Sequence, residues 1–223
     1  MNQDGPRPDT ATMKVIHKMF RREFALLPGL VEAAAGQPGR IPALTGHLRI
    51  LLTVLHHHHT SEDDVLWPVL EQRAASNHEL VETMLRQHGQ VADGVERTGE
   101  LAEAWSNGRH PEQAAQLADT LRALSADLDE HMDVEENQAL PLIHEQLSVA
   151  EWQRVVDAGS EAMPAGPVAR LRILGALFED ATEWERAWLL AELPRAAGLL
   201  WRLAGPATYR RYTRALRGTA AQL

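Results

Sequence analysis

One short motif occurs twice in this chain of 223 residues: a histidine followed four residues later by a glutamate. The copies are His58-x-x-x-Glu62 and His131-x-x-x-Glu135, and each leads through acidic and aliphatic residues to a proline six positions after the glutamate. Residues four apart lie on one face of an α-helix, so each copy presents an imidazole and a carboxylate to one point in space. Two such helices facing each other can hold two metal ions.

Both motifs lie on apolar stripes of their helices. At helical spacing, the neighbours of His58 are Leu51, Val54, Leu55, Val65 and Leu66, and those of His131 are Leu121, Leu124, Leu128, Ala139 and Leu142. A helix bundle buries such a stripe. Neither stripe carries a basic residue that could neutralise a buried glutamate, and an unpaired buried carboxylate is costly. A metal cation would neutralise both glutamates.

Two further histidines occupy apolar stripes. His17 lies among Met13, Phe20 and Phe24, and His88 lies among Val81, Met84, Leu85, Val91 and Val95. Four helices with one inward histidine each, two of them adding a glutamate, give six candidate ligands: His17, His58, Glu62, His88, His131 and Glu135. Six imidazole and carboxylate donors predict a site for two iron ions. Asp127, one turn before His131, is either an acceptor that orients an imidazole or a solvated acid.

The run of four histidines at residues 56–59 leaves the phase of its helix open. Helical spacing places His58 inward as the ligand and the two residues before it outside. The alternative ligand is His59, which has Asp63 at the same spacing. The remaining histidines are predicted to be surface or loop residues: His47, His78, His110 and His144.

Periodicity and loop signals predict an all-α chain with no strand. Four helices are expected, at residues 10–35, 45–74, 77–105 and 112–146. Their connections are short, which favours antiparallel neighbours and an up-down-up-down four-helix bundle over residues 10–147. Capping boxes that begin at Ser148 and Thr182 start further helices, so we expect a C-terminal helical extension over residues 148–223.

These residues resemble the metal-binding pattern of hemerythrin-like proteins with a His-His-Glu (HHE) cation-binding domain, in the H-HxxxE-H-HxxxE form of bacterial di-iron members. The resemblance covers residues 10–147. It implies a hemerythrin-like bundle with ligands on all four helices, in the order His17; His58 and Glu62; His88; His131 and Glu135. It also implies a non-heme di-iron centre that is oxo- or hydroxo-bridged, with bridging carboxylates and terminal histidines.

The chain departs from the oxygen-carrying members of that family at two positions. Those members have a second histidine one turn after the first on the third helix, where this chain has Ala92. They also end the fourth-helix motif in aspartate at a spacing of five, where this chain has Glu135 at four. We expect position 92 to face the metal, so that the alanine leaves one more position open to an external ligand. That opening favours reaction with hydrogen peroxide or nitric oxide over reversible oxygen storage.

Composition excludes several classes of protein. The chain has no cysteine, so neither disulfides nor thiolate metal sites are available. A net charge of −9 argues against binding to nucleic acid, because phosphate contacts need clustered lysine and arginine. The N-terminal segment MNQDGPRPDT is polar and no apolar run is long enough to cross a membrane, so we expect a cytoplasmic protein without a transmembrane segment.

Charge is distributed unevenly along the chain. Residues 194–223 contain six arginines and no acid, and subtracting these six charges from −9 leaves −15 on residues 1–193. This basic end either folds back on the acidic bundle or offers a docking surface to a protein partner, an anionic membrane or another copy of the chain.

The sequence therefore supports two classes of function. The first is a di-iron oxidoreductase that decomposes hydrogen peroxide in a catalase-like cycle or reduces nitric oxide. The second is a binding module that senses oxygen, nitric oxide or iron without turnover, with the helical extension reporting to a partner. A specialised di-iron oxidase is a further alternative, because one ligand set serves many substrates.

Overall fold

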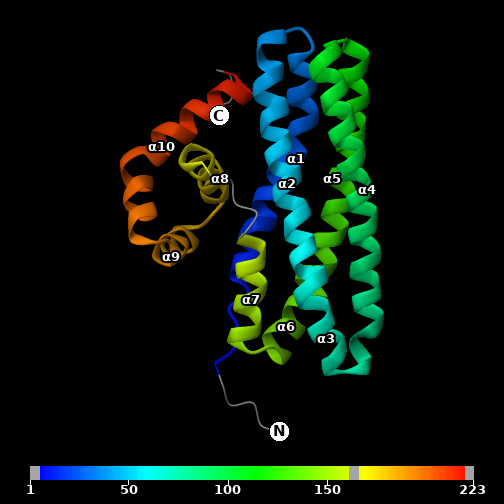
Figure 1. Cartoon of the computed structure of the whole chain (residues 1–223), viewed down its shortest axis with the longest axis vertical. Helices are drawn as coiled ribbons and strands as arrows, with labels where there is room; N and C mark the ends of the chain where they lie inside the picture. Colours follow the sequence, from blue (N-terminus) through cyan, green and yellow to red (C-terminus); the bar gives the residue numbers. More distant parts are fainter. Residues whose placement is uncertain (1–5, 161–165, 219–223) are drawn as a thin grey trace.

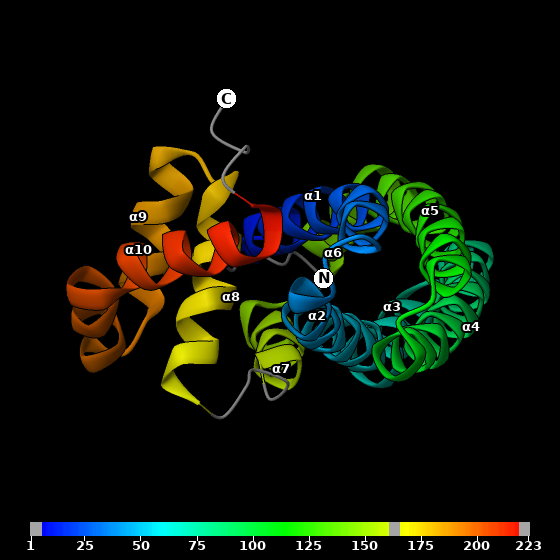
Figure 2. The ribbon, with the colours of Figure 1, turned by 90° about the horizontal axis from the view of Figure 1, so that it is seen from above.

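The computed structural model describes residues 6–160 and 166–218, and every regular element in those ranges is a helix. Four long helices form a bundle: α1 (Ala11–Ala34), α2 (Ile41–Ser61), α4 (His78–Gly108) and α5 (Pro111–Val134). They run alternately up and down (Figure 1), and seen from above they form a ring in the order α1, α2, α4, α5 (Figure 2). The predicted all-α bundle is confirmed.

Neither α2 nor α5 continues as a regular α-helix to its predicted end. Five-residue π-helical turns, Glu62–Leu66 and Glu135–Ala139, lead from these helices into α3 (Trp67–Arg73) and α6 (Leu140–Gln146). A proline, Pro68 or Pro141, is the second residue after each π turn. Proline lacks an N–H donor and its ring clashes with the carbonyl four residues earlier, which accounts for the wider turn. The repeated motif therefore places each of its glutamates at the start of a π turn.

Two apolar clusters fill the bundle, one on each side of the candidate ligands. The larger packs α1, α2, α4 and α5 together and includes Phe20, Leu55 and Trp105. The smaller lies toward α3 and α6 and includes Trp67. On each bundle helix the candidate ligands lie at the boundary between the two clusters. They therefore form a polar layer across an apolar core. Leu85, predicted to be buried on α4, is 44% exposed.

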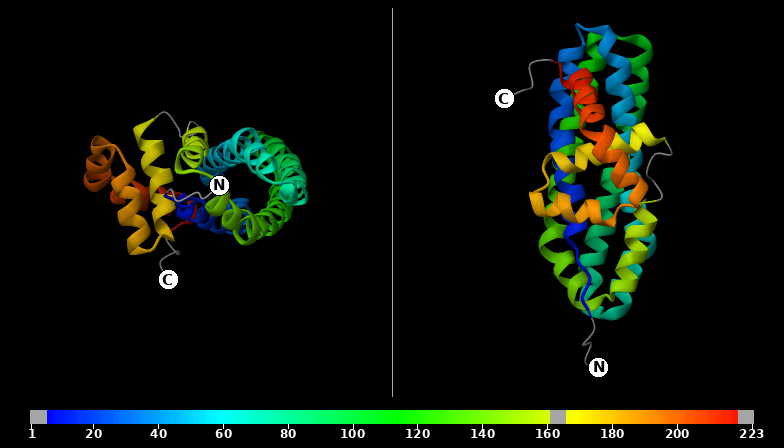
Figure 3. Two further views of the ribbon diagram at one scale, coloured as in Figure 1. Left: turned by 90° about the horizontal axis from the view of Figure 1, so that it is seen from below. Right: turned by 90° about the vertical axis from the view of Figure 1, so that its left-hand side faces the viewer.

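Four further helices pack beside the bundle: α7 (Val149–Ser160), α8 (Pro167–Glu179), α9 (Glu183–Glu192) and α10 (Arg195–Arg217). They lie on the side of α1 and α2, with α7 along α2 and α8 crossing α1 (Figures 2 and 3). Both predicted capping boxes are present, at Ser148 with Glu151 and at Thr182 with Glu185. Within the described ranges, no helix combines the length and apolarity needed to cross a membrane.

The basic end of the chain folds back on the bundle, which is the first of the two predicted arrangements. Arg217 of α10 donates to Glu23 of α1 at 3.2 Å and to Glu179 of α8 at 2.6 Å. Arg40, just before α2, donates to the backbone carbonyl of Leu216. The bundle and α10 are therefore joined by charged contacts as well as by apolar packing.

Candidate metal centre

Seven buried side chains, from the four bundle helices and the π turns that follow α2 and α5, gather in two groups. One group is His17, His58 and Glu135, and the other is His59, Glu62, His88 and His131. Within each group, one nitrogen or oxygen atom per residue lies within 4.8 Å of the others. All seven residues are at most 7% exposed. The structure thus brings together the six residues predicted from the sequence and adds His59.

Each of the two glutamates lies between the groups. Glu62 Oε1 is 3.3 Å from Nε2 of His58, and Glu62 Oε2 is 3.5 Å from Nε2 of His88. Glu135 Oε2 is 3.2 Å from Nε2 of His17 and 3.7 Å from Nε2 of the histidine in its own motif. Each carboxylate therefore faces one histidine from each group. This arrangement suits a carboxylate that is shared by two metal ions.

Burial shapes the protonation of the site. It lowers the pKa of His58 to about 3 and of His131 to about 4, and it lowers the pKa of His59 well below its usual value. Neutral imidazole is the form that binds metal. Burial and the charge of Glu135 raise the pKa of Glu62 well above its usual value. Burial acts in the same direction on Glu135, but the surrounding histidines outweigh it and lower that pKa to about 2. Without a cation, the site thus keeps only one of its two carboxyl groups charged.

These carboxylates have no hydrogen-bond donor of their own. All four carboxylate oxygens of Glu62 and Glu135 are buried without a hydrogen-bond partner in the described part of the chain. The ring nitrogens converge as well, with 3.4 Å between Nε2 of His58 and Nε2 of His17. Burial acts to lower the pKa of His17, but Glu135 and Glu136 outweigh it and raise that pKa, so His17 partly offsets the charge of Glu135. Glu62 has no such partner, and an unpaired buried carboxylate is unfavourable. Carboxylate and imidazole are ligands of transition metals, so the residues present fit a pair of metal ions.

The residue after each motif glutamate contacts a histidine on another helix. Asp63 Oδ1 lies 2.6 Å from Nδ1 of His88, and Glu136 Oε1 lies 2.9 Å from Nδ1 of His17. An Nδ1–H that donates to the acid leaves Nε2 as the metal-binding atom. Burial acts to raise the pKa of Glu136, but hydrogen bonds from His17 and Arg21 outweigh it and lower that pKa to about 2. Both acids therefore orient candidate ligands.

The sequence did not predict that these two acids orient histidines, and it named Asp63 only as the partner of His59. Asp127, considered as an acceptor from an imidazole, is exposed. The available signal was the acid directly after the glutamate in both copies of the motif, Asp63 in EDD and Glu136 in EEN.

His59 joins the cluster together with His58, although the sequence presented the two as alternatives. Its ring stacks on that of His88, with 4.1 Å between centroids and 10° between planes. The ring of His59 is also edge-on to the ring of His131, with 4.8 Å between centroids and 76° between planes. Adjacent residues point about 100° apart on an α-helix. Since the two groups lie next to each other, neighbouring histidines at the end of α2 can each face one of them.

The expectation for Ala92 is wrong. Ala92 is exposed on α4 and does not face the candidate ligands. Meanwhile His59 supplies a seventh donor that the sequence argument did not count. The extra open position inferred from this alanine therefore has no support in the structure, and neither does the preference for peroxide or nitric oxide that depended on it.

The prediction for His47 is also wrong, because this residue is 4% exposed and belongs to a second buried polar cluster. Its Nε2 lies 3.1 Å from Glu23 Oε2, and its Nδ1 lies 2.7 Å from the hydroxyl of Tyr212. Glu23 also accepts from Arg22 at 2.7 Å and from Arg217 at 3.2 Å. We call these five residues the Glu23 cluster. The other histidines predicted at the surface are exposed: His78, His110 and His144.

The fold and the site define a helical-bundle protein with a buried cluster of histidines and glutamates that can bind metal. The family model of the hemerythrin HHE cation-binding domain matches residues 9–143, which is more than half of the chain. The chain therefore belongs to the hemerythrin HHE cation-binding family. No curated protein and no solved structure matches it. The family match ends before α7, so it does not extend to the helices from α7 to α10.

Proposed function

We propose that this protein holds a non-heme di-iron centre that reacts with a small neutral ligand: oxygen, hydrogen peroxide or nitric oxide. The observation that carries the proposal is the position of Glu62 and Glu135 between the two groups, buried and without a hydrogen-bond donor. One ion would be held by His17, His58 and Glu135, and the other by His59, Glu62, His88 and His131. Donors that combine imidazole with carboxylate and lack thiolate suit iron.

A bound pair of iron ions supplies electron exchange with a small oxidant. The chain contributes the surroundings of that chemistry. Its apolar clusters limit the access of water, and Asp63 and Glu136 hold two of the imidazoles in a fixed orientation. Burial lowers the pKa of His58, His59 and His131, which favours the neutral form that binds metal.

The first candidate function is an oxidoreductase that decomposes hydrogen peroxide in a catalase-like cycle or reduces nitric oxide. It is supported by a cavity that reaches His58 and Glu62, since a small neutral molecule can approach the centre through it. The second candidate is a sensor of oxygen, nitric oxide or iron. It is supported by the ion pair between Lys18 and Glu185, 2.7 Å long, which joins α9 to the residue directly after His17. A change at the metal would reach the extension by this contact.

Metal analysis of the purified protein tests the centre itself. We expect about two irons per chain, with an ultraviolet charge-transfer band of a bridged diferric pair. One zinc per chain without iron would contradict the proposal. Anaerobic reduction followed by oxygen, peroxide and nitric oxide in turn then separates the candidates. Repeated turnover of one ligand identifies an oxidoreductase, and a stoichiometric spectral change without turnover identifies a sensor.

Two further expectations stay predictions from the sequence. A cytoplasmic location agrees with a chain that has no cysteine. Association with a protein partner or a second copy through the arginine-rich α10 would use the arginines other than Arg217, which is paired within the chain.

A further inference from the structure

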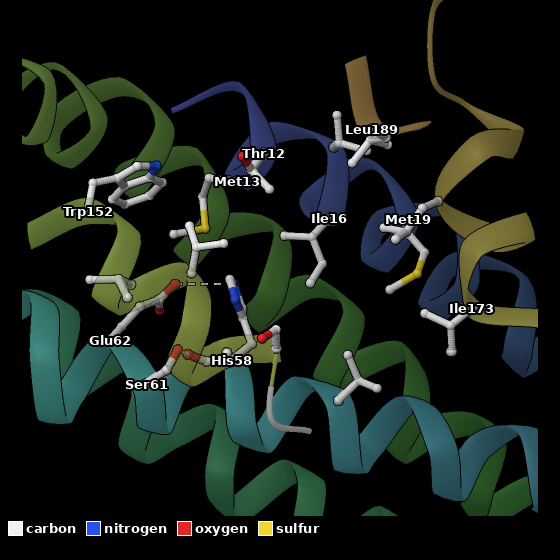
Figure 4. A pocket seen from close by; sticks show the side chains of 17 residues that line it. Thr12, Met13, Ile16, Met19, His58, Ser61, Glu62, Trp152, Ile173 and Leu189 are labelled. Atoms are coloured by element: carbon white, nitrogen blue, oxygen red, sulfur yellow. Dashed lines mark hydrogen bonds and ion pairs between the residues drawn. The ribbon is translucent and has the colours of Figure 1, made fainter. Parts of the chain in front are cut away.

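An apolar cavity lies between the bundle and the C-terminal helices, and it reaches the candidate metal centre (Figure 4). Its bundle side is formed by α1 and α2, with Met13, Ile16 and Met19 among the lining residues. Its outer side is formed by α7, α8 and α9, which contribute Trp152, Ile173 and Leu189. The cavity has a volume of about 170 Å³. Helices outside the family match thus complete a cavity whose inner wall belongs to the bundle.

The lining of this cavity offers little polarity beyond the metal-centre residues. Thr12, Ser61 and Ser160 line it, and the two serine hydroxyls donate to backbone carbonyls of their own helices, each at 2.7 Å. Among the described lining residues there is no lysine, arginine or aspartate. A charged ligand would lose its hydration here without a compensating partner, whereas an apolar ligand would gain by leaving water.

The cavity meets the metal centre at His58 and Glu62. Both residues line it, and Figure 4 shows the imidazole and the carboxylate directed at each other at its edge, joined by the 3.3 Å contact between Nε2 and Oε1. The two residues belong to different groups of candidate ligands. A molecule in the cavity would therefore lie directly beside the residues assigned to both ions.

We propose that this cavity binds a small, uncharged, apolar organic molecule next to the metal centre, and that α7, α8 and α9 supply the outer wall of this binding site. A dry cavity of about 150 Å³ lined by aliphatic and aromatic side chains binds benzene. A volume of about 170 Å³ therefore suits a ligand of roughly six to eight non-hydrogen atoms. The methionines can adjust to its shape. The place of this ligand beside iron rests on the proposed function, whereas its binding rests on the cavity alone.

Three other cavities in the described part of the chain have charged walls. The one between α8, α9 and α10 is lined by Glu179, Arg186 and Arg210. The one between α2 and α4 is lined by Arg49, Glu96, Glu100 and Glu103. The one between α2 and α10 is lined by Arg172 and Arg211. Charged walls of this kind do not favour an apolar ligand. An apolar probe should therefore select the cavity beside His58.

Two substitutions fill the cavity without removing a candidate ligand. A side chain added at Gly159 of α7 would begin 3.3 Å from the hydroxyl of Ser61, which can rotate, so Gly159→Leu places its branches in the cavity. Leu189→Trp enlarges a partly exposed lining residue of α9. Gly29→Leu is the matched control, because Gly29 is also helical, is exposed and has open space where a side chain would begin. Replacing helical glycine by leucine favours the helix in both cases.

Titration of the full-length protein with fluorobenzene and with 4-fluorobenzoate, followed by fluorine NMR, tests the proposal. We expect fluorobenzene to bind at least about tenfold more tightly than the benzoate, since burial of an unpaired charge is costly. Gly159→Leu and Leu189→Trp should each weaken fluorobenzene binding about tenfold or more, and Gly29→Leu should leave it unchanged. Equal binding of the two probes, or wild-type affinity in both cavity-filling variants, would overturn the proposal.

Iron content measured on the same samples separates this proposal from the proposed function. Selective fluorobenzene binding by protein without iron would leave the cavity proposal standing and overturn the di-iron centre. In anaerobically reduced protein that contains iron, the signal of bound fluorobenzene should be broadened by the paramagnetic ions. A sharp signal in iron-containing protein would show that the ligand lies away from the centre, and the proposal would be wrong.

Discussion

Two sites in the same bundle bury glutamate side chains, and they solve the problem of the buried charge in different ways. Glu23 is 2% exposed and accepts hydrogen bonds from Arg22 and Arg217. Burial acts to raise its pKa, but His47 and Arg22 outweigh burial and lower that pKa to about 2. Glu62 is 0% exposed, has no hydrogen-bond donor, and its pKa is raised by burial. Equal burial therefore leads to opposite protonation.

The difference shows what each carboxylate needs. The chain itself supplies the cations around Glu23, one of them from α10, so this residue joins the extension to the bundle. Around Glu62 the described part of the chain supplies imidazoles and a second carboxylate but no arginine or lysine, so a charge that neutralises its carboxylate must come from outside. Removing one partner of a buried ion pair strongly destabilises the folded protein. Replacing a buried carboxyl group that is already neutral does not leave a charge unpaired. The two glutamates should therefore respond differently to the same substitution.

Loss of metal is the largest effect we expect. His58→Ala, His59→Ala and Glu135→Ala should each remove most of the iron, because each deletes a donor from a group of three or four. His56→Ala and His57→Ala are matched controls, since both histidines are exposed on the same helix. Iron per folded chain, measured by elemental analysis, checks this. Equal iron loss in the His56 and His58 variants would show that the ligands are assigned to the wrong helical phase.

Glu23→Gln should give the largest loss of stability. It leaves Arg22, Arg217 and His47 without their shared carboxylate, so we expect the free energy of unfolding to fall by about 3 kcal/mol while the iron content is unchanged. Glu62→Gln is the control, for which we expect a loss of iron binding with little loss of stability. In metal-free protein it should change the free energy of unfolding little, because Glu62 is already held neutral, yet it should lower iron binding. Urea denaturation and metal analysis of both variants test the comparison. A similar destabilisation by both changes would contradict it.

The pH dependence of the unfolding free energy should show whether the charge of Glu23 stabilises the protein. The pKa of Glu23 is lowered from 4.5 to about 2 in the folded protein, so its contribution is fully present above about pH 4.5 and is lost as the pH falls toward 2. The difference in unfolding free energy between wild type and Glu23→Gln, about 3 kcal/mol near pH 6, should therefore shrink across this window. Denaturation of metal-free protein at several pH values measures it. A difference that stays constant down to pH 2 would assign the stability to something other than the charge of Glu23.

Asp63→Asn should have a smaller effect, confined to the metal. Asp63 accepts from Nδ1 of His88, and loss of such a contact typically weakens metal binding by about 10- to 100-fold. Asp64→Asn is the matched control, since Asp64 is the next residue and is exposed. Competition with a chelator gives the relative affinities. Identical affinities for the two variants would show that Asp63 does not orient the ligand.

The sequence predicted those features of the candidate metal centre that depend on local periodicity. Each of the six proposed ligands could be placed on a buried face because its neighbours at helical spacing are apolar. Local periodicity also produced the error at Ala92. A step of four residues advances an α-helix by about 40° beyond a full turn. On α4 the buried face is set by Met84, Gln87, His88 and Val91, and position 92 falls outside it.

The Glu23 cluster could not be predicted in this way. His47 and Tyr212 are 165 residues apart in the sequence, and Glu23 and Arg217 are 194 apart. Such contacts depend on where α10 docks, and no pattern within the bundle specifies that. His59 was given only as an alternative to His58 for a different reason: periodicity assigns a helix one inward face, whereas two adjacent groups of candidate ligands can use neighbouring residues.

The smallest effect we expect concerns the support that α10 gives to the Glu23 cluster. The hydroxyl of Tyr212 lies 2.7 Å from Nδ1 of His47, whose other nitrogen faces Glu23. Tyr212→Phe removes this contact and should cost about 1 kcal/mol of stability, typical of one hydrogen bond. Because Tyr212 acts on Glu23 through His47, the cost should be smaller in a Glu23→Gln background, and a double-mutant cycle measures the coupling. Ser148→Ala, which loses the capping contact to Glu151 at the start of α7, is the control and should be additive with Glu23→Gln. If Tyr212→Phe is additive as well, the tyrosine contact does not help to hold that carboxylate charged, and the support that α10 gives to Glu23 comes from Arg217.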